Sequence, residues 1–168
     1  MLIIREETAS DSEAVLRVER DAFGEDGEAR LVEALRAAGR VLLSLVAELD
    51  GDIVGHVLFS PMTIEAEGAA YAAVCLGPLA VATVHQRQGI GGKLMETGLA
   101  ELRSAGHRAV FLLGHPSYYP RFGFRPAREF DVHFEDDRDA FMAIELYPGA
   151  LAGVAGKAKF APEFDAFV

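Results

Sequence analysis

Apolar residues recur along the first part of the chain with the period of a strand and then with that of helices. The run from Leu2 to Arg5 predicts a short strand. Ser10 to Glu13 has the pattern of a capping box, in which a serine accepts from first-turn amides and a glutamate reaches back. Two short helices are expected from there on, and Gly39 is the predicted stop of the second. Their apolar positions are Val15, Val18 and Ala22, then Leu31, Leu35 and Ala38.

Two β-rich runs follow, from Val41 to Leu49 and from Ile53 to Ile64. Asp50-Gly51 separates them and predicts a tight hairpin, because both residues tolerate the positive φ that such turns need. A further turn around Gly68 leads into a third apolar run, Tyr71 to Val81. The pattern therefore predicts an antiparallel meander.

The second half of the chain begins with a helix, from Gly89 onward, that has an apolar and a charged face. The apolar run Ala109 to Leu113 is typical of a buried parallel strand. Pro116 to Arg121 predicts one or two turns of helix, because proline suits the first helical position. Further strands are expected at Phe124 to His133, at Phe141 to Tyr147 and late in the chain around Val154 to Phe160. The order βααβββαβαββ predicts an α+β fold, a mixed sheet with helices on both faces and a ligand crevice at the parallel pair.

The length of 168 residues and the hydrophobic fraction of 51% fit one domain with a proper core. Cys75 is the only cysteine, which excludes an internal disulfide, and its apolar surroundings predict a buried thiol. The first residues show no basic stretch followed by a long apolar segment, and no run approaches the ~20 apolar residues that span a bilayer. We therefore expect a cytoplasmic protein that does not enter a membrane.

The formal net charge is −10, from 16 basic and 26 acidic side chains. Such a surface repels phosphate backbones, which counts against nucleic acid as a partner, and it attracts a cationic molecule such as an amine. Two acidic clusters, Glu25 to Glu28 and Glu135 to Asp139, are candidates to flank the site of a cationic acceptor. A merely solvated acidic surface is the alternative interpretation of both clusters.

The turn Gln86-Arg87-Gln88-Gly89-Ile90-Gly91-Gly92 lies between a predicted strand and a predicted helix. Glycines let the backbone approach an anion, the first-turn amides of the helix have no internal partner, and the helix dipole adds partial positive charge. Arg87 or Lys93 can add counter-charge. These features predict a cradle for a pyrophosphate, and a tight strand-to-helix turn without a ligand is the alternative.

Two other phosphate-binding loops do not fit this turn. A Walker loop needs glycine where Arg87 stands and serine or threonine where Leu94 stands. A dinucleotide fingerprint needs a third glycine at position 94 and an acid at the end of the next strand, where Leu113 and Gly114 stand.

Together with their neighbours, these residues resemble the acetyl-CoA-binding motif of GNAT-type N-acetyltransferases. The matching parts are Leu79-Ala80-Val81, the short turn after it, Gln86-x-x-Gly89-Ile90-Gly91 and the amphipathic helix. Val110 to Leu113 resembles the next strand of that family, Tyr119 to Phe124 its Tyr-x-x-x-Gly-Phe segment, and Ile3 to Asp11 its usual start. The resemblance covers about residues 2–147, which we expect to form the N-acetyltransferase domain, with residues 148–168 as a C-terminal extension packed on the same domain.

The resemblance implies a GNAT-like sheet whose central parallel strands splay apart, with acetyl-CoA as co-substrate in the gap. Residues Leu79 to Val81 would hold the pantetheine arm and the thioester, and an amide near Val81 would polarise the thioester carbonyl. The amides of Arg87 to Lys93 would hold the pyrophosphate. The implied cofactor-binding residues are Leu79, Ala80, Val81, Gln86, Arg87, Gln88, Gly89, Ile90, Gly91, Gly92 and Lys93.

The resemblance also implies a catalytic role for Tyr119, which lies four residues before Gly123 at the position of the family's general acid. A phenol near the thioester sulfur can protonate the departing thiolate. Tyr118 is the neighbouring alternative. A core tyrosine beside Phe122 and Phe124 is the interpretation without a catalytic role.

The general base is less well defined, because the strand Tyr71 to Val81 lacks the carboxylate that many relatives carry there. The candidates are Glu25, Asp26, Glu28, His115 and a water chain leading to bulk solvent. Relatives often carry asparagine after the strand Ala109 to Leu113, whereas here His115 and Ser117 flank Pro116. The other histidines, which show no metal-ligand spacing, are His56, His85, His107 and His133, so no metal is expected.

The expected activity is acetyl transfer from acetyl-CoA to a primary amine of a small molecule or peptide, by a monomer or a homodimer. Two alternatives stay open. One is a non-catalytic acyl-CoA-binding or sensing module on the same fold, and the other is an acyltransferase with a different acyl group or a hydroxyl acceptor.

Overall fold

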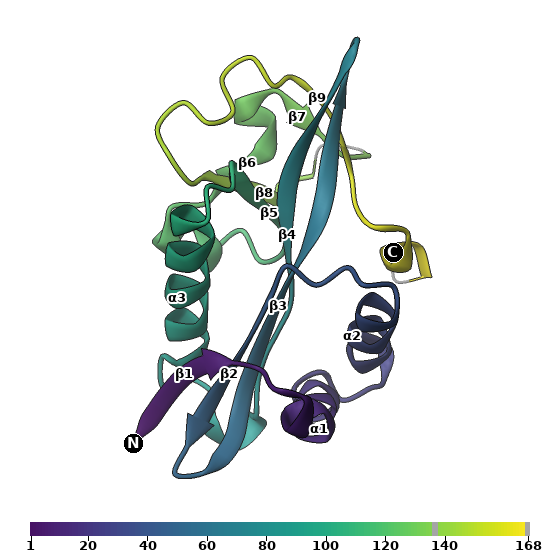
Figure 1. Cartoon of the computed structure of the whole chain (residues 1–168). Helices are drawn as coiled ribbons and strands as arrows, with labels where there is room; N and C mark the ends of the chain where they lie inside the picture. Colours follow the sequence, from purple (N-terminus) through teal and green to yellow (C-terminus); the bar gives the residue numbers. More distant parts are fainter. Residues whose placement is uncertain (136–137, 167–168) are drawn as a thin grey trace. The chain divides into compact units, whose positions relative to one another are not determined.

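The computed structural model describes residues 1–135 and 138–166 of the chain. These residues form two compact units. Figure 1 labels the helices and strands along the chain. The first unit holds Met1–Ser60, Gly77–Gly98 and the C-terminal segment from Pro162, and the second holds Pro61–Leu76 and Leu99–Ala161. Strands β3 and β4 and helix α3 contribute residues to both units: β3 is Asp52–Ala66, β4 is Ala69–Val81 and α3 is Ile90–Ser104.

The first unit contains the antiparallel strands that the sequence predicts. Its sheet runs in the order β1-β2-β3-β4, and β2 pairs antiparallel with both β1 and β3. The predicted hairpin at Asp50-Gly51 is confirmed, since φ is 51° at Asp50 and 91° at Gly51. The remaining elements of this unit are β1 (Leu2–Glu6), α1 (Ser12–Phe23), α2 (Gly27–Ala37) and β2 (Leu43–Leu49).

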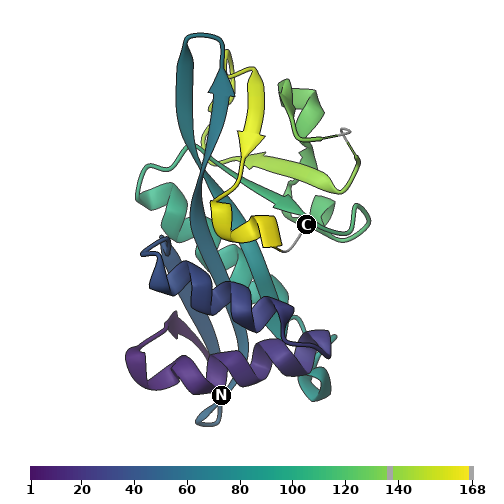
Figure 2. The same ribbon diagram turned by 90° about the vertical axis from the view of Figure 1, so that its right-hand side faces the viewer.

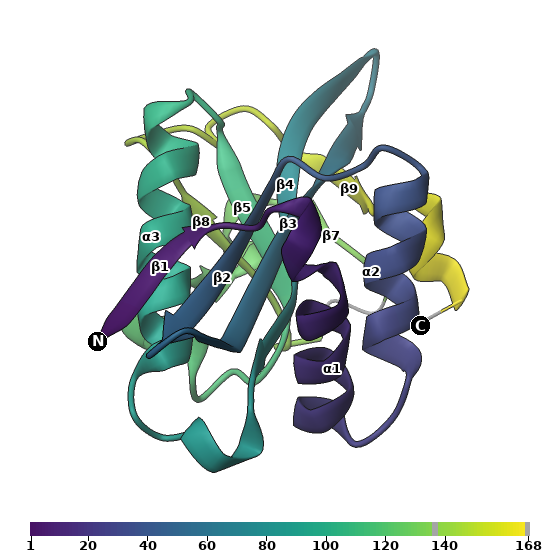
Figure 3. The same cartoon turned by 60° about the horizontal axis from the view of Figure 1, so that its bottom comes forward.

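Helices cover both faces of this sheet, with α1 and α2 side by side on one face and the start of α3 on the other (Figure 3). Gly55 and His56, two neighbouring residues of β3, set this arrangement, because successive strand residues face opposite sides of the sheet. A Cβ atom at Gly55 would lie 3.0 Å from Leu94 and 3.3 Å from Ile90, so glycine lets α3 pack closely. The next residue, His56, contacts Glu19 of α1 instead.

The first helix starts differently from the prediction of a capping box at Ser10 to Glu13. The amide of Thr8 donates to Asp11 Oδ2 at 2.7 Å, and the 3-10 turn η1 (Ala9–Asp11) leads into α1. Arg5 holds the Asp11 carboxylate through two hydrogen bonds of 2.8 and 3.0 Å, and this contact also keeps the pKa of Asp11 well below its ordinary value. The capping acid is therefore Asp11, whereas Glu13 is exposed.

The second unit contains the mixed part of the sheet. β4 pairs in parallel with β5, β5 pairs antiparallel with β8, and β8 pairs antiparallel with β6. β9 pairs antiparallel with β3 and in parallel with β7. These strands are β5 (Ala109–Leu113), β6 (Arg125–Pro126), β7 (Val132–His133), β8 (Phe141–Glu145) and β9 (Gly156–Lys159).

The sequence predicts one strand from Phe124 to His133, whereas the structure has the two short strands β6 and β7 with a 3-10 turn, η4 (Ala127–Phe130), between them. Pro126 lacks the N–H group that would continue the ladder. Asp131 takes a φ of 61°, which a regular strand does not permit.

The C-terminal part of the chain supplies one element to each unit. β9 is the late strand that the sequence predicts around Val154 to Phe160. The 3-10 turn η5 (Pro162–Ala166) lies beside α2 in the first unit (Figure 2). Glu163 of this turn pairs with Arg40 at 2.8 Å.

Candidate active site

The end of β4 has one edge bonded to β3. The amide of Ala82 donates to the carbonyl of Val54 at 2.8 Å. Because the amides of successive strand residues point alternately to the two edges, the amide of Val81 points away from β3. On that other side, the parallel register of β4 with β5 ends at Cys75 opposite Phe111. The backbone of Leu79 to Val81 therefore lies beyond the part of β4 that pairs with β5.

The glycine-rich turn between β4 and α3 is an exposed stretch of backbone. Gln86, Arg87, Gln88 and Gly89 are all exposed. Arg87 and Gly89 have φ values of 65° and 83°, the left-handed conformation that turns successive amides toward a common side. α3 starts at the next residue, Ile90, whose side chain is 4% exposed and holds this end of the helix in the core. The first-turn amides of α3 thus stand next to the turn.

Two side chains brace this turn within the first unit. Gln86 Nε2 donates to the carbonyl of Val81 at 2.9 Å and closes the turn back on the end of β4. The carboxylate of Asp21, near the end of α1, accepts from the amide of Thr83 at 2.7 Å. The C-terminal end of α1 is therefore fixed against the connection between β4 and α3. The side chain of Gln86 thus has a structural contact, because it binds a backbone carbonyl of the protein.

Tyr119 belongs to the second unit, where the predicted helical turns at Pro116 to Arg121 are a 3-10 turn, η3 (Tyr119–Phe122). Its ring packs edge-on against Tyr118 and Phe124, with centroids 5.1 and 5.9 Å away. A Cβ atom at Gly114, just after β5, would overlap this ring. Burial raises the pKa of Tyr119 to about 12, so the phenol keeps its proton at neutral pH.

The other aromatic candidate, Tyr118, has a different environment. Its ring lies under the guanidinium of Arg121, with Cζ 4.5 Å from the ring centroid, and its carbonyl accepts from Arg121 Nε at 2.9 Å. His115 is exposed, and its carbonyl accepts from the amide of Tyr118 at 3.1 Å. These contacts lead the loop into η3, with Tyr118 as the residue just before it.

Of the three carboxylates proposed as general base, Glu28 has the most suitable environment. Glu25 is exposed, and Asp26 pairs with Arg20 at 2.8 Å and Arg30 at 3.7 Å. Glu28 lies in the first turn of α2, and its Oε1 is buried with no hydrogen-bond partner among the described residues. Burial raises the pKa of Glu28 above its ordinary value of 4.5. Asp136 and Asp137 of the second acidic cluster lie outside the described residues.

The first unit also contains a buried polar pair that was not predicted. His56 Nδ1 lies 2.6 Å from Glu19 Oε2, and neither side chain is exposed. A lone histidine inside the apolar run of β3 was the only signal, because its partner lies 37 residues away on α1. Cys75 is buried, as predicted.

Metal-binding clusters and membrane-spanning helices are absent from the part of the chain that the structure describes. No group of three or more His, Cys, Asp or Glu side chains in residues 1–135 and 138–166 is placed to hold a metal ion. Within the same ranges, none of the helices has the length and apolar character needed to cross a bilayer.

Comparison with known proteins identifies the family. A family model of the acetyltransferase (GNAT) domain matches residues 3–127. YjhQ, an uncharacterized N-acetyltransferase of Escherichia coli K12, is 44% identical over 119 residues, which are 70% of this chain and 66% of that protein. YhbS, a second uncharacterized N-acetyltransferase of the same strain, is 36% identical over 99% of this chain and 100% of that protein.

Solved structures agree with the sequence matches. The crystal structure of Escherichia coli YhbS in complex with CoA superposes with a TM-score of 0.93 at 35% identity, over 99% of this chain and 93% of that chain. A GNAT family acetyltransferase from Brucella melitensis in complex with acetyl-CoA gives 0.82 at 37% identity, over 98% and 99%. The predicted α+β fold and the acyltransferase class are confirmed by these matches. The chain belongs to the GNAT family of N-acetyltransferases.

Proposed function

We propose that the protein transfers the acetyl group of acetyl-CoA to a primary amine of a small molecule or peptide by direct attack of the amine on the thioester. The observation that carries this proposal is the exposed turn from Gln86 to Gly89, with left-handed backbone and the first-turn amides of α3 next to it. Such a turn suits an anionic pyrophosphate. Two relatives with 35% and 37% identity hold CoA and acetyl-CoA in their solved structures.

The end of β4 supports the placement of the pantetheine arm along Leu79 to Val81. A backbone edge beyond the paired part of a strand can bind an amide-rich arm as an added strand would. The amide of Val81 points to this edge, because the amide of Ala82 is bonded to β3. A fixed N–H group there stabilises the negative charge that grows on the thioester carbonyl oxygen. The amides of Arg87 to Lys93 complete the proposed site.

Tyr119 is the proposed general acid for the departing thiolate. Its pKa of about 12 keeps the hydroxyl protonated, as the role requires. A free thiol has an ordinary pKa of about 8.5, so full proton transfer from this phenol to a free thiolate is uphill. The hydroxyl therefore acts mainly by donating a hydrogen bond while charge builds on the sulfur. A hydrogen bond to a charged group contributes about 1.5–3 kcal/mol, or roughly 10- to 150-fold in rate.

Glu28 is the proposed general base for the acceptor ammonium. A base works best when its pKa lies near the working pH, and burial moves the pKa of Glu28 in that direction. The carboxylates of the α1–α2 region also favour a cationic acceptor over an anionic one. The proposed catalytic domain spans residues 2–147, with residues 148–168 as an extension on it, and the protein acts as a monomer or a homodimer.

A thiol-release assay with acetyl-CoA and a broad pool of primary amines tests the proposal. We expect CoA thiol to appear only when an amine from the pool is present. Acetyl-CoA binding without thiol release over the whole pool would instead indicate the sensing module, and release with hydroxyl acceptors alone would indicate a different acyltransferase.

A further inference from the structure

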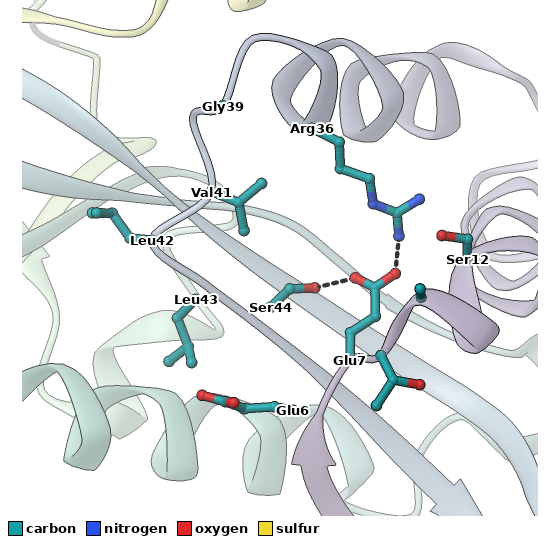
Figure 4. A pocket seen from close by; sticks show the side chains of 11 residues that line it. Glu6, Glu7, Ser12, Arg36, Gly39, Val41, Leu42, Leu43 and Ser44 are labelled. Carbon is teal, nitrogen blue, oxygen red and sulfur yellow. Dashed lines mark hydrogen bonds and ion pairs between the residues drawn. The ribbon is translucent and has the colours of Figure 1, made fainter.

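A chain of hydrogen bonds runs through the first unit on the side of the sheet that faces α1. Glu19 Oε2 lies 2.6 Å from His56 Nδ1, and His56 Nε2 lies 2.9 Å from Ser44 Oγ. Ser44 Oγ in turn donates to Glu7 Oε1 at 2.6 Å, and the other oxygen of Glu7 pairs with Arg36. Figure 4 shows the outer end of this chain, where Glu7 stands between Ser44 and Arg36. We name these members, Glu19, His56, Ser44 and Glu7, the relay.

The chemistry of the relay fixes where its hydrogen atoms lie. A carboxylate paired with arginine is an acceptor only, so the hydroxyl of Ser44 donates to Glu7. Ser44 has no second hydrogen, so His56 Nε2 is the donor in the next bond. A neutral imidazole then leaves Nδ1 as an acceptor, and the proton of the last bond sits on Glu19.

The pKa directions agree with this assignment. Burial raises the pKa of Glu19 to about 8. The negative charge of the nearby Glu28 adds to this shift, and the positive charge of Arg36 opposes it. Burial lowers the pKa of His56 to about 4, with Glu7 opposing this shift and Arg36 adding to it. At neutral pH, Glu19 is therefore protonated and His56 is neutral. All bonds of the relay point the same way, from Glu19 to Glu7.

The order serine, histidine, acid also occurs in hydrolase triads, but this arrangement does not fit one. In a triad the acid is ionised and accepts from the histidine, and the histidine accepts from the serine. Here the hydroxyl of Ser44 is already donated to Glu7, and the proton between Glu19 and His56 belongs to the acid. His56 therefore does not act as a base on Ser44, whose proton points to Glu7 instead.

The two ends of the relay face different surroundings. At the inner end, Glu19 Oε1 is buried without a hydrogen-bond partner among the described residues, and the charge of Glu28 acts on this carboxyl group. At the outer end, Glu7 and Ser44 line a surface pocket of about 470 Å³, together with Ser12 and Arg36 (Figure 4). The relay thus connects the acidic α1–α2 region to a water-accessible pocket.

We infer that the relay Glu19–His56–Ser44–Glu7 carries the proton that each acetyl transfer releases from the α1–α2 region to solvent. This inference rests on the proposed function. An ammonium acceptor loses two protons when its nitrogen becomes an amide; one ends on the thiol of CoA and the other must leave. The relay passes the second one on in balanced steps.

Each member of the relay gains one proton and gives one away. Glu19 takes up a proton at Oε1, which the base Glu28 supplies, and gives its Oε2 proton to His56 Nδ1. His56 then gives its Nε2 proton to Ser44, and Ser44 gives its proton to Glu7. Glu7 releases it to water in the pocket.

Ser44→Ala tests the relay because it removes one link at a half-buried position. In dilute buffer we expect kcat to fall about 10-fold, the effect of losing one functional hydrogen bond, with the KM for acetyl-CoA unchanged. Added imidazole, a small proton carrier, should restore kcat in proportion to its concentration. Ser12→Ala is the matched control, because Ser12 lies in the same pocket wall and is no member of the relay. Ser44→Thr keeps the hydroxyl and should retain most of the rate.

A wild-type rate in Ser44→Ala, or a lower rate that imidazole leaves unchanged, would overturn the relay. If Ser44→Ala does not fold, nitrogen-15 NMR of His56 in the wild-type protein tests the relay. The relay requires the neutral tautomer with hydrogen on Nε2, and hydrogen on Nδ1 alone contradicts it. A wild-type protein that releases no thiol from acetyl-CoA would refute the proposed function instead, so the two failures are distinct.

Discussion

Gly114 lies against the ring of Tyr119, so closely that a Cβ atom at position 114 would overlap the ring carbons. The glycine after β5 therefore leaves the space that the buried phenol occupies. Its backbone has no positive φ that would require glycine. The side chain of Tyr119 is the reason for glycine at this position.

Gly114→Ala should displace the ring of Tyr119 and lower kcat by about 10- to 100-fold, since small misplacements of a catalytic group have effects of this size. The affinity for acetyl-CoA should stay at the wild-type value. Steady-state kinetics together with calorimetric titration of CoA measure both quantities. Normal turnover would show that the position of this ring does not matter.

Tyr119→Phe removes only the hydroxyl and should lower kcat roughly 10- to 150-fold, the range given by a hydrogen bond to a charged group. CoA affinity should be nearly unchanged. Tyr118→Phe is the matched control. The ring of Tyr118 makes its contacts with Tyr119 and Arg121, and the variant keeps this ring. If the control loses activity and Tyr119→Phe does not, the assignment passes to Tyr118.

Gly89→Ala should weaken CoA binding by about 10-fold or more, because the residue has a φ of 83° and its amide belongs to the proposed pyrophosphate cradle. Gly106→Ala is a matched control with a φ of 86°, beyond the end of α3. Neither added Cβ would meet another atom within 4 Å, so the backbone strain is similar. Equal losses of CoA affinity in both variants would contradict the cradle.

Glu28→Gln should lower kcat/KM for the amine by about 100-fold, the lower range for a general base. The pH profile is the more specific readout. The wild-type rate should rise as pH passes through the raised pKa of Glu28, and this acid limb should vanish in the variant. Glu25→Gln, an exposed neighbour, should keep the wild-type profile.

The pair Glu19 and His56 predicts an unusual dependence of stability on pH. Between pH 4.5 and 6.5, Glu19 is protonated in the folded chain and ionised in the unfolded chain. Over the same range, His56 is neutral in the folded chain and protonated in the unfolded chain. These opposite effects cancel. From pH 6.5 to about 8 only Glu19 contributes, and the free energy of unfolding should fall by about 2 kcal/mol.

Glu19→Gln separates these two contributions. The amide keeps a donor toward His56 Nδ1 but cannot ionise. The variant should therefore show no decline above pH 6.5 from this site, and its stability should rise with pH between about 4 and 6.5, where only His56 titrates. Urea unfolding over this pH range measures the effect, and parallel curves for variant and wild type would argue against a protonated Glu19.

The elements with strong local chemistry could be predicted from the sequence. Ala109–Leu113 forms β5 with the predicted bounds, because a continuous apolar run suits a strand buried on both faces. Asp50-Gly51 forms the predicted hairpin for the same local reason. The turn from Gln86 to Gly92 was found from its glycines and from the strand and helix that flank it.

Features that depend on distant partners could not be predicted in this way. The capping acid before α1 is Asp11 and not the predicted Glu13, because Arg5 of β1 holds the Asp11 carboxylate. Glu19 and His56 meet only after α1 has packed on β3, so neither residue carries a local signal. The expected strand at Phe124 to His133 failed where Pro126 and the left-handed Asp131 outweighed an apolar pattern.

Transfer of an isotopically labelled acetyl group tests the central claim most directly. The protein is incubated with labelled acetyl-CoA and a pool of primary amines, and the products are analysed by mass spectrometry. The account predicts label on an amide nitrogen in an amount equal to the CoA thiol released, with Tyr119→Phe slower by the factor given above. Acetyl-CoA that binds to the wild-type protein yet leaves every amine unlabelled would contradict it.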